Sequence, residues 1–378
     1  MISMTRLNIP ISWKFPVSLA VFAVFAAFPL VFSNGAVTTI AVFTLIYAAA
    51  ATAWNIFSGY TGYIALGHAA FFGLGCYTIA ILSQDWHIQA GWGPFWLVPL
   101  AGIVAAVFAV PLGAIALRTR KHTFVVMTIA MFFIFQLLAF NLHGLTNGAQ
   151  GLSLPIPLWD ANFYNLPFYY VSLAILVVAF ATSWWVRNSK FGLGLLAIRD
   201  DEDRARGLGV KTGWMKLAAF VLSAFFVGMT GAVWAYFLES IYPQFAFDPL
   251  FDLTIALAAF MGGLGTLSGP IIGALIVIPA QQYFTLYYGE NGYYLIIFGA
   301  LFLAVMLLLP QGIVPSLRRW WALWRVWRST RATPPQETTG PSVLEAFAAF
   351  DPNGANGLPA AQPGAANDTT QTSASQKN

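Results

Sequence analysis

The chain has 378 residues, of which 58% are hydrophobic and 8% are charged, and its formal net charge is +4. Because soluble domains carry about 25% charged residues, this composition excludes a soluble globular protein. About nine apolar stretches reach the roughly 20 residues that a membrane-spanning helix requires. The basic residues lie at the ends of these stretches, where orientation in the membrane explains them, so the charge does not indicate nucleic-acid binding. The sequence predicts an all-α polytopic protein embedded in a lipid membrane.

The first predicted span covers residues 15–32 and follows two basic residues, Arg6 and Lys14. No small-residue cleavage site of the signal-peptide type follows this span. We therefore expect the span to be retained, with the N-terminus in the cytoplasm. A second span is predicted at residues 36–57.

The stretch 55–82 combines glycines that loosen a helix with a stripe of small residues. Gly59 and Gly62 lie at its start, and one small residue then follows every four positions: Ala65, Ala69 and Gly73. Such stripes allow close helix packing in a membrane, and packing is the first explanation here. His68 lies beside the stripe, either hydrogen-bonded between helices or as a functional group inside the membrane.

The sequence of this stretch resembles a known family. From Gly59 to Thr78 it is similar to the signature GYTG-x-x-SLGHAAFFG-x-GAYT of the LivM-like permeases of branched-chain amino acid ABC importers. It departs at Tyr63 and Ala65, where the family commonly has Gln and Ser. The resemblance implies an ABC-importer permease fold with about 8–10 transmembrane helices, at least one of them broken or re-entrant.

A span at residues 94–117 ends in a basic cluster, Arg118, Arg120 and Lys121, which predicts a return to the cytoplasmic side. The next span, 123–141, leads to a loop at 143–167 without Lys or Arg, as expected outside the cell. Its LTNGAQGL segment resembles a TGG-x-x-GL loop of the same family. This loop is either a solvated turn or a surface that meets a substrate-delivery protein.

After a span at 168–186, the segment 187–216 holds eleven charged residues. Acidic residues precede basic ones by four positions in two pairs, Asp200 with Arg204 and Glu202 with Arg206, which favours a short amphipathic helix. Glycines at 207 and 209 are typical helix ends. An ordinary charged cytoplasmic loop is the alternative to a docking element.

The pattern Asp203-x-Ala205-x-x-x-Gly209 resembles the E-A-A-x-x-x-G pattern of ABC-permease coupling loops, with Arg204 in place of the first Ala. The resemblance implies that segment 187–216 docks onto a partner ATPase and carries its motion into the membrane. The candidate coupling residues are Arg199, Asp200, Asp201, Glu202, Asp203, Arg204, Arg206, Gly207 and Gly209.

The run 252–277 is interrupted by glycines and by Pro270, which removes a hydrogen bond from a helix. It resembles the family motif GGLGT-x-x-GP-x-x-GA. A broken helix at membrane depth has to be buried in protein or line a cavity. Interrupted segments in two halves of a transporter point to its pathway, which pairs 59–83 with 252–277. The pathway and break candidates are Gly59, Gly62, His68, Gly73, Gly262, Gly263, Gly265, Gly269 and Pro270.

Charge at the C-terminal end supports this break. After the last predicted span, 292–310, five arginines predict a cytoplasmic C-terminus: Arg318, Arg319, Arg325, Arg328 and Arg331. Three apolar runs, 217–238, 252–279 and 292–310, separate Lys216 from this cluster. Since an even number of crossings is needed, one run is split or re-entrant, and the interrupted run is the best candidate. We expect a permease domain at 1–320 and a disordered cytoplasmic tail at 330–378.

Three classes of function remain: an ABC-importer permease, a stand-alone carrier or channel, and an intramembrane enzyme. The sequence has no phosphate-binding loop, its histidines are too scattered for a local metal site, and no catalytic set is evident. The spans are nearly free of the carboxylates that ion-coupled carriers often use. With the resemblance included, the first class leads.

The resemblance implies a complex in the inner membrane that imports Leu, Ile and Val. Its other members are a LivH-like permease, two cytoplasmic ATP-binding subunits and an extracytoplasmic binding protein. This chain is expected to bind no cofactor, since ATP and Mg²⁺ belong to the partner ATPases. Urea or short amides are the alternative substrates.

Overall fold

The computed structural model describes residues 14–32, 34–288, 296, 299–300, 303–304, 307, 312–317, 319–321 and 324. The chain divides into two units, Met1–Ala322 and Leu323–Asn378. In the second unit only Trp324 is described, and it is helical. The predicted tail at 330–378 and most of the predicted span at 292–310 lie outside the described residues.

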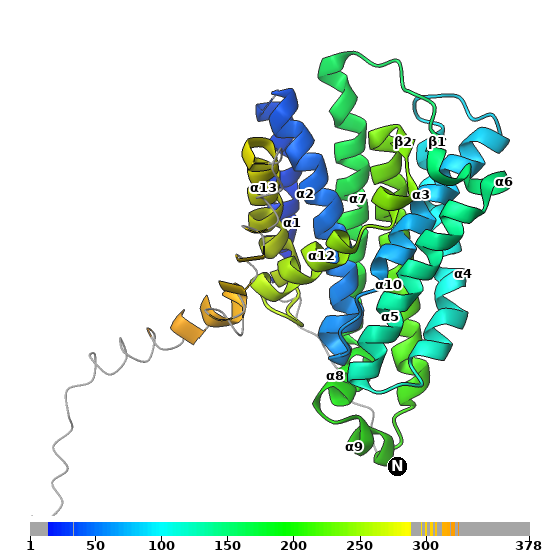
Figure 1. Ribbon diagram of the computed structural model, residues 1–378. Coiled ribbons are helices and arrows are strands. Elements are labelled where there is room, and N and C mark those ends of the chain that lie inside the picture. Colours follow the sequence, from blue (N-terminus) through cyan, green and yellow to red (C-terminus); the bar gives the residue numbers. More distant parts are fainter. Residues whose placement is uncertain are drawn as a thin grey trace, which may run out of the picture. The chain divides into compact units, whose positions relative to one another are not determined.

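The first unit is a helical bundle (Figure 1). Its long helices are α1 (Lys14–Val31), α2 (Gly35–Trp54), α3 (His68–Asp85), α4 (Val98–Ala116), α5 (Lys121–Asn141), α7 (Ala161–Asn188), α10 (Thr212–Leu238), α12 (Pro249–Gly262) and α13 (Gly269–Tyr288). A π-helical turn, Asn55–Gly59, extends α2, and a 3₁₀ turn, Pro94–Leu97, leads into α4. The short elements are α6 (His143–Thr146), a 3₁₀ turn (Gly148–Gln150), β1 (Leu152–Ser153), α8 (Lys190–Asp200), α9 (Glu202–Gly207), β2 (Ser240–Ile241) and α11 (Pro243–Ala246).

Within the described residues, six helices are long and apolar enough to cross a membrane: Gly35–Gly59, Pro94–Ala116, His122–Asn141, Phe163–Asn188, Thr212–Leu238 and Pro243–Gly262. The helices α1, α3 and α13 add three more of 18 to 20 residues. The predicted all-α polytopic class is therefore confirmed, and these lengths agree with the expected eight to ten helices.

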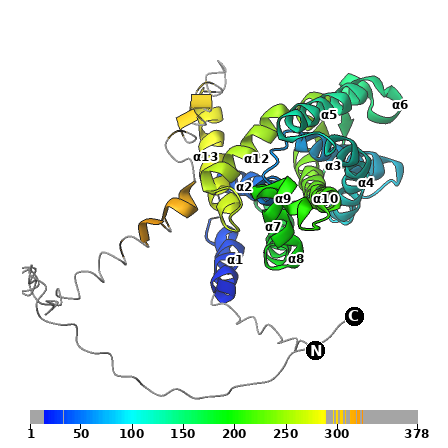
Figure 2. The same cartoon turned by 90° about the horizontal axis from the view of Figure 1, so that it is seen from below.

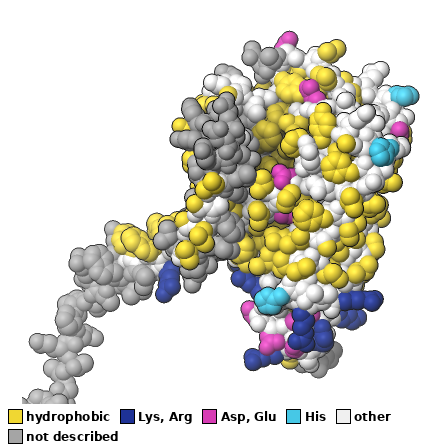
Figure 3. Space-filling view, in the orientation of Figure 1, with side chains coloured by type: hydrophobic (Ala, Val, Ile, Leu, Met, Phe, Trp, Pro, Cys, Tyr) yellow, Lys and Arg dark blue, Asp and Glu magenta, His cyan; other side chains and the backbone are white. Residues whose placement is uncertain are grey.

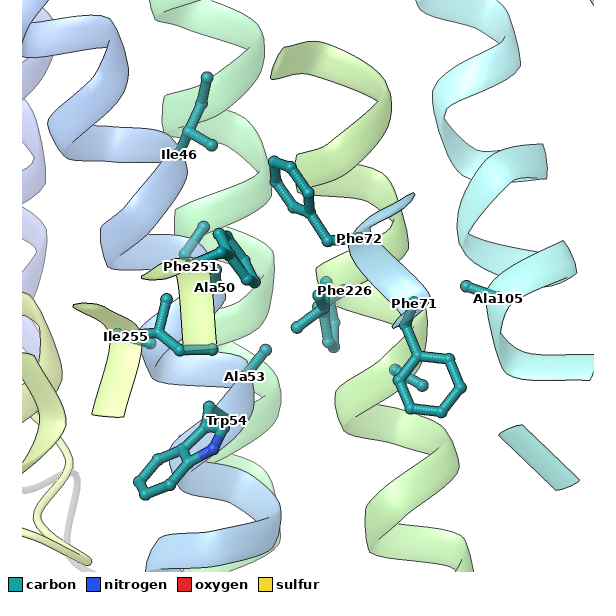
Figure 4. Close-up of a cluster of buried hydrophobic side chains, with 14 of the residues drawn as sticks. Ile46, Ala50, Ala53, Trp54, Phe71, Phe72, Ala105, Phe226, Phe251 and Ile255 are labelled. Carbon is teal, nitrogen blue, oxygen red and sulfur yellow. The ribbon is translucent and has the colours of Figure 1, made fainter. Parts of the chain in front are cut away.

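Helix α10 lies at the centre and packs against α2, α3 and α4. Small residues bring the helices close together: a Cβ atom on Gly75 of α3 would lie 2.0 Å from the Gly228 carbonyl oxygen of α10. Because lipid provides no hydrophobic driving force between helices, close packing of the helix backbones stabilises their association. A second contact joins α2 to α12, where Phe251 lies beside Ala50 (Figure 4). The ring of Trp54 lies 6.0 Å from that of Phe260 of α12, centroid to centroid.

Both predicted helix breaks are present. The first break, residues 62–67, separates the π-helical turn after α2 from α3, and the second, residues 263–268, separates α12 from α13. Gly62 and Gly265 take left-handed backbone angles, with φ of +72° and +73°, which side chains with a Cβ rarely adopt. Pro270 does not cause the second break, contrary to the prediction. It is the second residue of α13, where its missing N–H has no helical partner to lose.

Polar groups of the first break are satisfied by protein, as membrane depth requires. The Trp54 indole N–H donates to the Ala65 carbonyl at 2.8 Å. The Ala65 N–H donates to Ser58 Oγ, and the Leu66 N–H donates to Thr128 Oγ1. Side chains from α2, the π-helical turn and α5 therefore fix the broken segment.

The two ends of the bundle differ. One end carries β1 and β2, an antiparallel pair in which Leu152 faces Ile241, together with α6. The opposite end carries α8 and α9, and Figure 2 looks onto it. The predicted loop 143–167 therefore contains ordered elements, and α7 begins within it at Ala161. We call these the β1 end and the α9 end.

Candidate functional site

The charged segment at the α9 end folds into two helices, α8 and α9, rather than one. Asp201 separates them and caps α9, since its carboxylate accepts hydrogen bonds from the backbone N–H groups of Asp203 and Arg204, both at 3.0 Å. Gly209, with φ of +85°, follows the helix end. The capped helix starts and stops where its sequence favours it, and this fixes which side chains point outward.

The exposed surface of α9 and its flanking residues, 200–209, mixes both charges with one large apolar side chain. Leu208, at the end of α9, is 86% exposed. The exposed residues around it are Asp200, Asp203, Arg204, Arg206, Gly207 and Gly209. Leu208 was not among the predicted candidates, because a lone leucine in a charged segment gives no sequence signal.

The ion pairs on this surface differ in part from the predicted ones. Arg204 lies 3.0 Å from the Asp201 carboxylate, three residues earlier, instead of pairing with Asp200. Capping explains this, because Asp201 lies directly at the start of α9. The predicted pair between Glu202 and Arg206 is present at 3.3 Å.

Glu202 points inward, toward α10, and its predicted role in coupling stays a prediction. Its Oε1 atom accepts a hydrogen bond from Lys216 Nζ of α10 at 2.6 Å, and its Oε2 atom accepts one from the Tyr63 hydroxyl. Lys216 is only 3% exposed, and its Nζ lies 4.4 Å from the Tyr63 ring centroid. Burial acts to raise the pKa of Glu202, but the hydrogen bonds from Lys216 and Tyr63 outweigh it and lower the pKa below its usual value. These contacts fasten α9 to α10.

Arg199 also points into the protein, where it reaches both helix breaks. Its Nη1 atom donates to the Gly59 carbonyl oxygen at 3.0 Å, at the end of the π-helical turn. The same atom would lie 2.3 Å from a Cβ on Gly265, so it packs directly against the second break. A cation at the carbonyl end of a helix is favoured by the helix dipole.

Two more side chains hold the second break. Arg187, in the last turn of α7, donates from Nη1 to the Gly265 carbonyl oxygen at 2.7 Å. Asn55 accepts from the Gly265 N–H at 2.8 Å and donates to the Thr266 carbonyl oxygen at 2.9 Å. We call Asn55, Arg187 and Arg199 the Gly265 bracket. The structure thus brings together the two predicted breaks and one predicted coupling residue.

Deeper in the bundle, His68 is fully buried, and its Nε2 atom lies 2.8 Å from Ser223 Oγ of α10. This geometry matches the first alternative, a histidine hydrogen-bonded between helices. Gly73 likewise lies in packing contact, since a Cβ there would lie 2.2 Å from the Phe247 ring.

Asp252 of α12 is a buried carboxylate that sequence reasoning left aside. It is 2% exposed, and both of its oxygens lie 3.2 Å from the Ala69 N–H at the start of α3. A carboxylate at a helix N-terminus offsets the positive end of the dipole. Asp252, on the helix before the second break, therefore caps α3, the helix after the first break.

At the β1 end, a polar recess of about 450 Å³ lies between α3 and the 143–153 segment. Gln84, Asp85, His143, Asn147 and Ser153 contribute polar groups to its lining. The predicted external loop therefore forms a shaped surface.

This combination of a helical bundle, two joined helix breaks and an exposed capped helix defines a membrane permease. Residues 36–306 match the family described as branched-chain amino acid transport system / permease component, and the chain belongs to this family.

The chain is 30% identical over 332 residues to the high-affinity branched-chain amino acid transport system permease protein LivM of Escherichia coli K12, covering 80% of this chain and 75% of that protein. It is 28% identical to LivM of Salmonella typhimurium, covering 79% and 75%. It is also 23% identical to LivH of Escherichia coli K12, covering 71% and 91%. No solved structure matches the chain.

Proposed function

We propose that this chain is the permease subunit of an ABC importer that moves Leu, Ile and Val inward across the cytoplasmic membrane. Family membership over residues 36–306 supports the class of function. The observation that carries the mechanism is α9, a capped and exposed helix fastened to α10 through Glu202 and Lys216. A short helix held in this way moves as a rigid body with the membrane helices.

The proposed complex contains a second, LivH-like permease, two cytoplasmic ATP-binding subunits and an extracytoplasmic binding protein. Similarity of this chain to both LivM and LivH supports a pair of related permeases. ATP and Mg²⁺ are bound by the partner ATPases, which hydrolyse the nucleotide, and this chain is the passive transport subunit.

The α9 end faces the cytoplasm in this proposal. Lys and Arg side chains gather at this end, and hydrophobic side chains cover the middle of the bundle (Figure 3). Cytoplasmic loops carry an excess of Lys and Arg. The N- and C-termini are assigned to the same side, and the polar recess at the β1 end then faces the binding protein.

Leu208 is the proposed apolar anchor of the docking surface. Interfaces place apolar side chains at their centre and charged ones at the rim. Leu208 directly follows α9, whose residues Asp203, Arg204 and Arg206 are exposed, so an apolar side chain and charged ones share this surface. The ATPase partner is expected to offer an apolar groove with charged edges.

A stand-alone carrier is the second candidate, and Asp252 is the observation that bears on it. An ion-coupled carrier uses an intramembrane carboxylate that is free to bind the ion. Both oxygens of Asp252 face a backbone N–H of α3, which favours a structural role. Urea or a short amide as substrate is the alternative within the importer class.

The experiment that tests the proposal is gentle detergent extraction of the tagged chain from its native membrane, followed by mass spectrometry of the proteins that co-purify. Recovery of a second permease and an ATPase supports the importer. Recovery of the chain alone, still able to transport in liposomes without ATP, contradicts it.

A further inference from the structure

We propose that the Gly265 bracket is the joint through which movement of α8 and α9 reaches the helix breaks inside the membrane. This inference rests on the proposed function, and assigns Asn55, Arg187 and Arg199 as positioning residues for transport. None of the three needs to touch the substrate or the ATPase.

The first argument is connectivity. Arg199 is the second-last residue of α8, and the single residue Asp201 separates α8 from α9. A displacement of α9 is therefore passed to Arg199 over one short, capped connection. At its other end, Arg199 contacts Gly59 of the first break region and Gly265 of the second. One side chain, that of Arg199, therefore connects the end of α8 next to α9 with both helix breaks.

The second argument is the absence of space around Arg199. A Cβ on Gly62 would lie 3.0 Å from Arg199 Cγ, and a Cβ on Gly265 would lie 2.3 Å from its Nη1. The guanidinium cannot move toward the breaks without displacing their backbone. Close-packed contacts of this kind transmit displacement because packed interiors have low compressibility.

The third argument is the type of bond. In the part of the chain that the structure describes, neither Arg187 nor Arg199 is paired with a carboxylate, and both donate to glycine carbonyl oxygens. Hydrogen bonds from charged donors are about twice as strong as neutral ones. The two guanidinium groups therefore hold the Gly265 and Gly59 carbonyl groups in place. Asn55, in the π-helical turn after α2, accepts a hydrogen bond from the Gly265 N–H.

Arg187 and Arg199 also enter the site from different helices. Arg187 lies in the last turn of α7, and only Ser189 separates α7 from α8. Arg199 lies near the opposite end of α8. A rotation of α8 relative to α7 therefore changes the distance between the Arg187 guanidinium, which donates to the Gly265 carbonyl oxygen, and the Arg199 guanidinium, which packs against Gly265. We infer that the loop takes different positions in the ATP-bound and nucleotide-free importer.

The test uses the complete complex reconstituted in liposomes, with leucine uptake and ATP hydrolysis measured on the same vesicles. Arg199→Ala is expected to leave assembly and ATP hydrolysis in place and to lower uptake per ATP by about ten- to a hundredfold, the range of one hydrogen bond from a charged donor. Arg199→Lys, which keeps the charge but not the planar fork, should recover part of the loss. The matched control is Lys190→Ala, an exposed cation on the same helix.

Hydrogen–deuterium exchange of the peptide covering residues 262–270 gives the second readout. In the wild-type complex, exchange should differ between nucleotide-free and ATP-bound states, and Arg199→Ala should remove this difference. If Arg199→Ala leaves both the ratio of uptake to ATP hydrolysis and the exchange response unchanged, the proposal that the Gly265 bracket is the joint is overturned. Failure of the wild-type chain to assemble with an ATPase is a separate result, which would overturn the proposed function instead.

Discussion

Lys216 Nζ lies 2.6 Å from Glu202 Oε1, and this pair joins the first residue of α9 to the first turns of α10. The pair is more than a surface ion pair, because Lys216 is almost fully buried and the Tyr63 hydroxyl donates to the same carboxylate. It converts a six-residue helix, too short to be stable alone, into a fixed part of the bundle.

Removal of one partner of this pair should destabilise the protein. Lys216→Met leaves Glu202 without its buried cation, and we expect a loss of about 2 kcal/mol in the free energy of unfolding. Glu202→Gln combined with Lys216→Met should cost less than Lys216→Met alone, since no buried charge is left unpaired. Thermal unfolding of the purified variants in detergent measures this. Additive losses in the double variant would contradict the pairing.

The same pair predicts a pH dependence. The folded-state pKa of Glu202 is lowered from its reference value of 4.5, so its contribution to stability is fully present above that value. As the pH falls below 4.5 and through the folded pKa, the carboxylate takes up a proton and the contribution is lost. The difference in melting temperature between wild type and Glu202→Gln should be constant near neutral pH and shrink below pH 4.5. A difference that grows as the pH falls would refute the assignment.

Leu208 is expected to carry binding energy at the docking surface. Leu208→Asp places a charge where we expect an apolar groove, and should remove most of the co-purifying ATPase. Leu208→Met, which keeps the volume and apolar character, should retain it. Because Leu208 is 86% exposed in the chain by itself, neither change should alter the melting temperature of the isolated subunit. Full ATPase recovery with Leu208→Asp would place the anchor elsewhere.

A substitution at Asp252 distinguishes an ABC importer from a stand-alone ion-coupled carrier. Asp252→Asn keeps one acceptor oxygen for the Ala69 N–H, so an importer should retain leucine uptake, with a loss of stability of about 1 kcal/mol. Asp252→Ala should cost more, since it leaves the start of α3 uncapped. Uptake by reconstituted Asp252→Asn protein is the measurement. A well-folded Asp252→Asn protein without uptake would point to a carboxylate that takes part in transport.

The features that local sequence predicts are those whose cause is local. Gly62 and Gly265 favour backbone angles that end helices, so both breaks could be placed from the chain alone. The limits of α9 follow from Asp201 at one end and the glycines at the other. The polytopic class follows from apolar stretches of sufficient length.

The features that sequence reasoning missed depend on partners far apart in the chain. Tyr63 and Glu202 are 139 residues apart, and Arg199 and Gly59 are 140 apart. From sequence alone, a charged residue in a charged segment is predicted to be solvent-exposed, and only the fold shows that it points inward. The same reason explains why Asp252 was left aside, since its partner at Ala69 lies 183 residues away.

The most direct test of the central claim is uptake of radiolabelled leucine into proteoliposomes that contain this chain and its co-purified partners, with ATP supplied on the α9 side. We predict uptake that requires ATP, the binding protein and the ATPase, and that stops when ATP is replaced by a non-hydrolysable analogue. Leucine uptake by the chain alone, driven by an ion gradient and indifferent to ATP, would contradict the account.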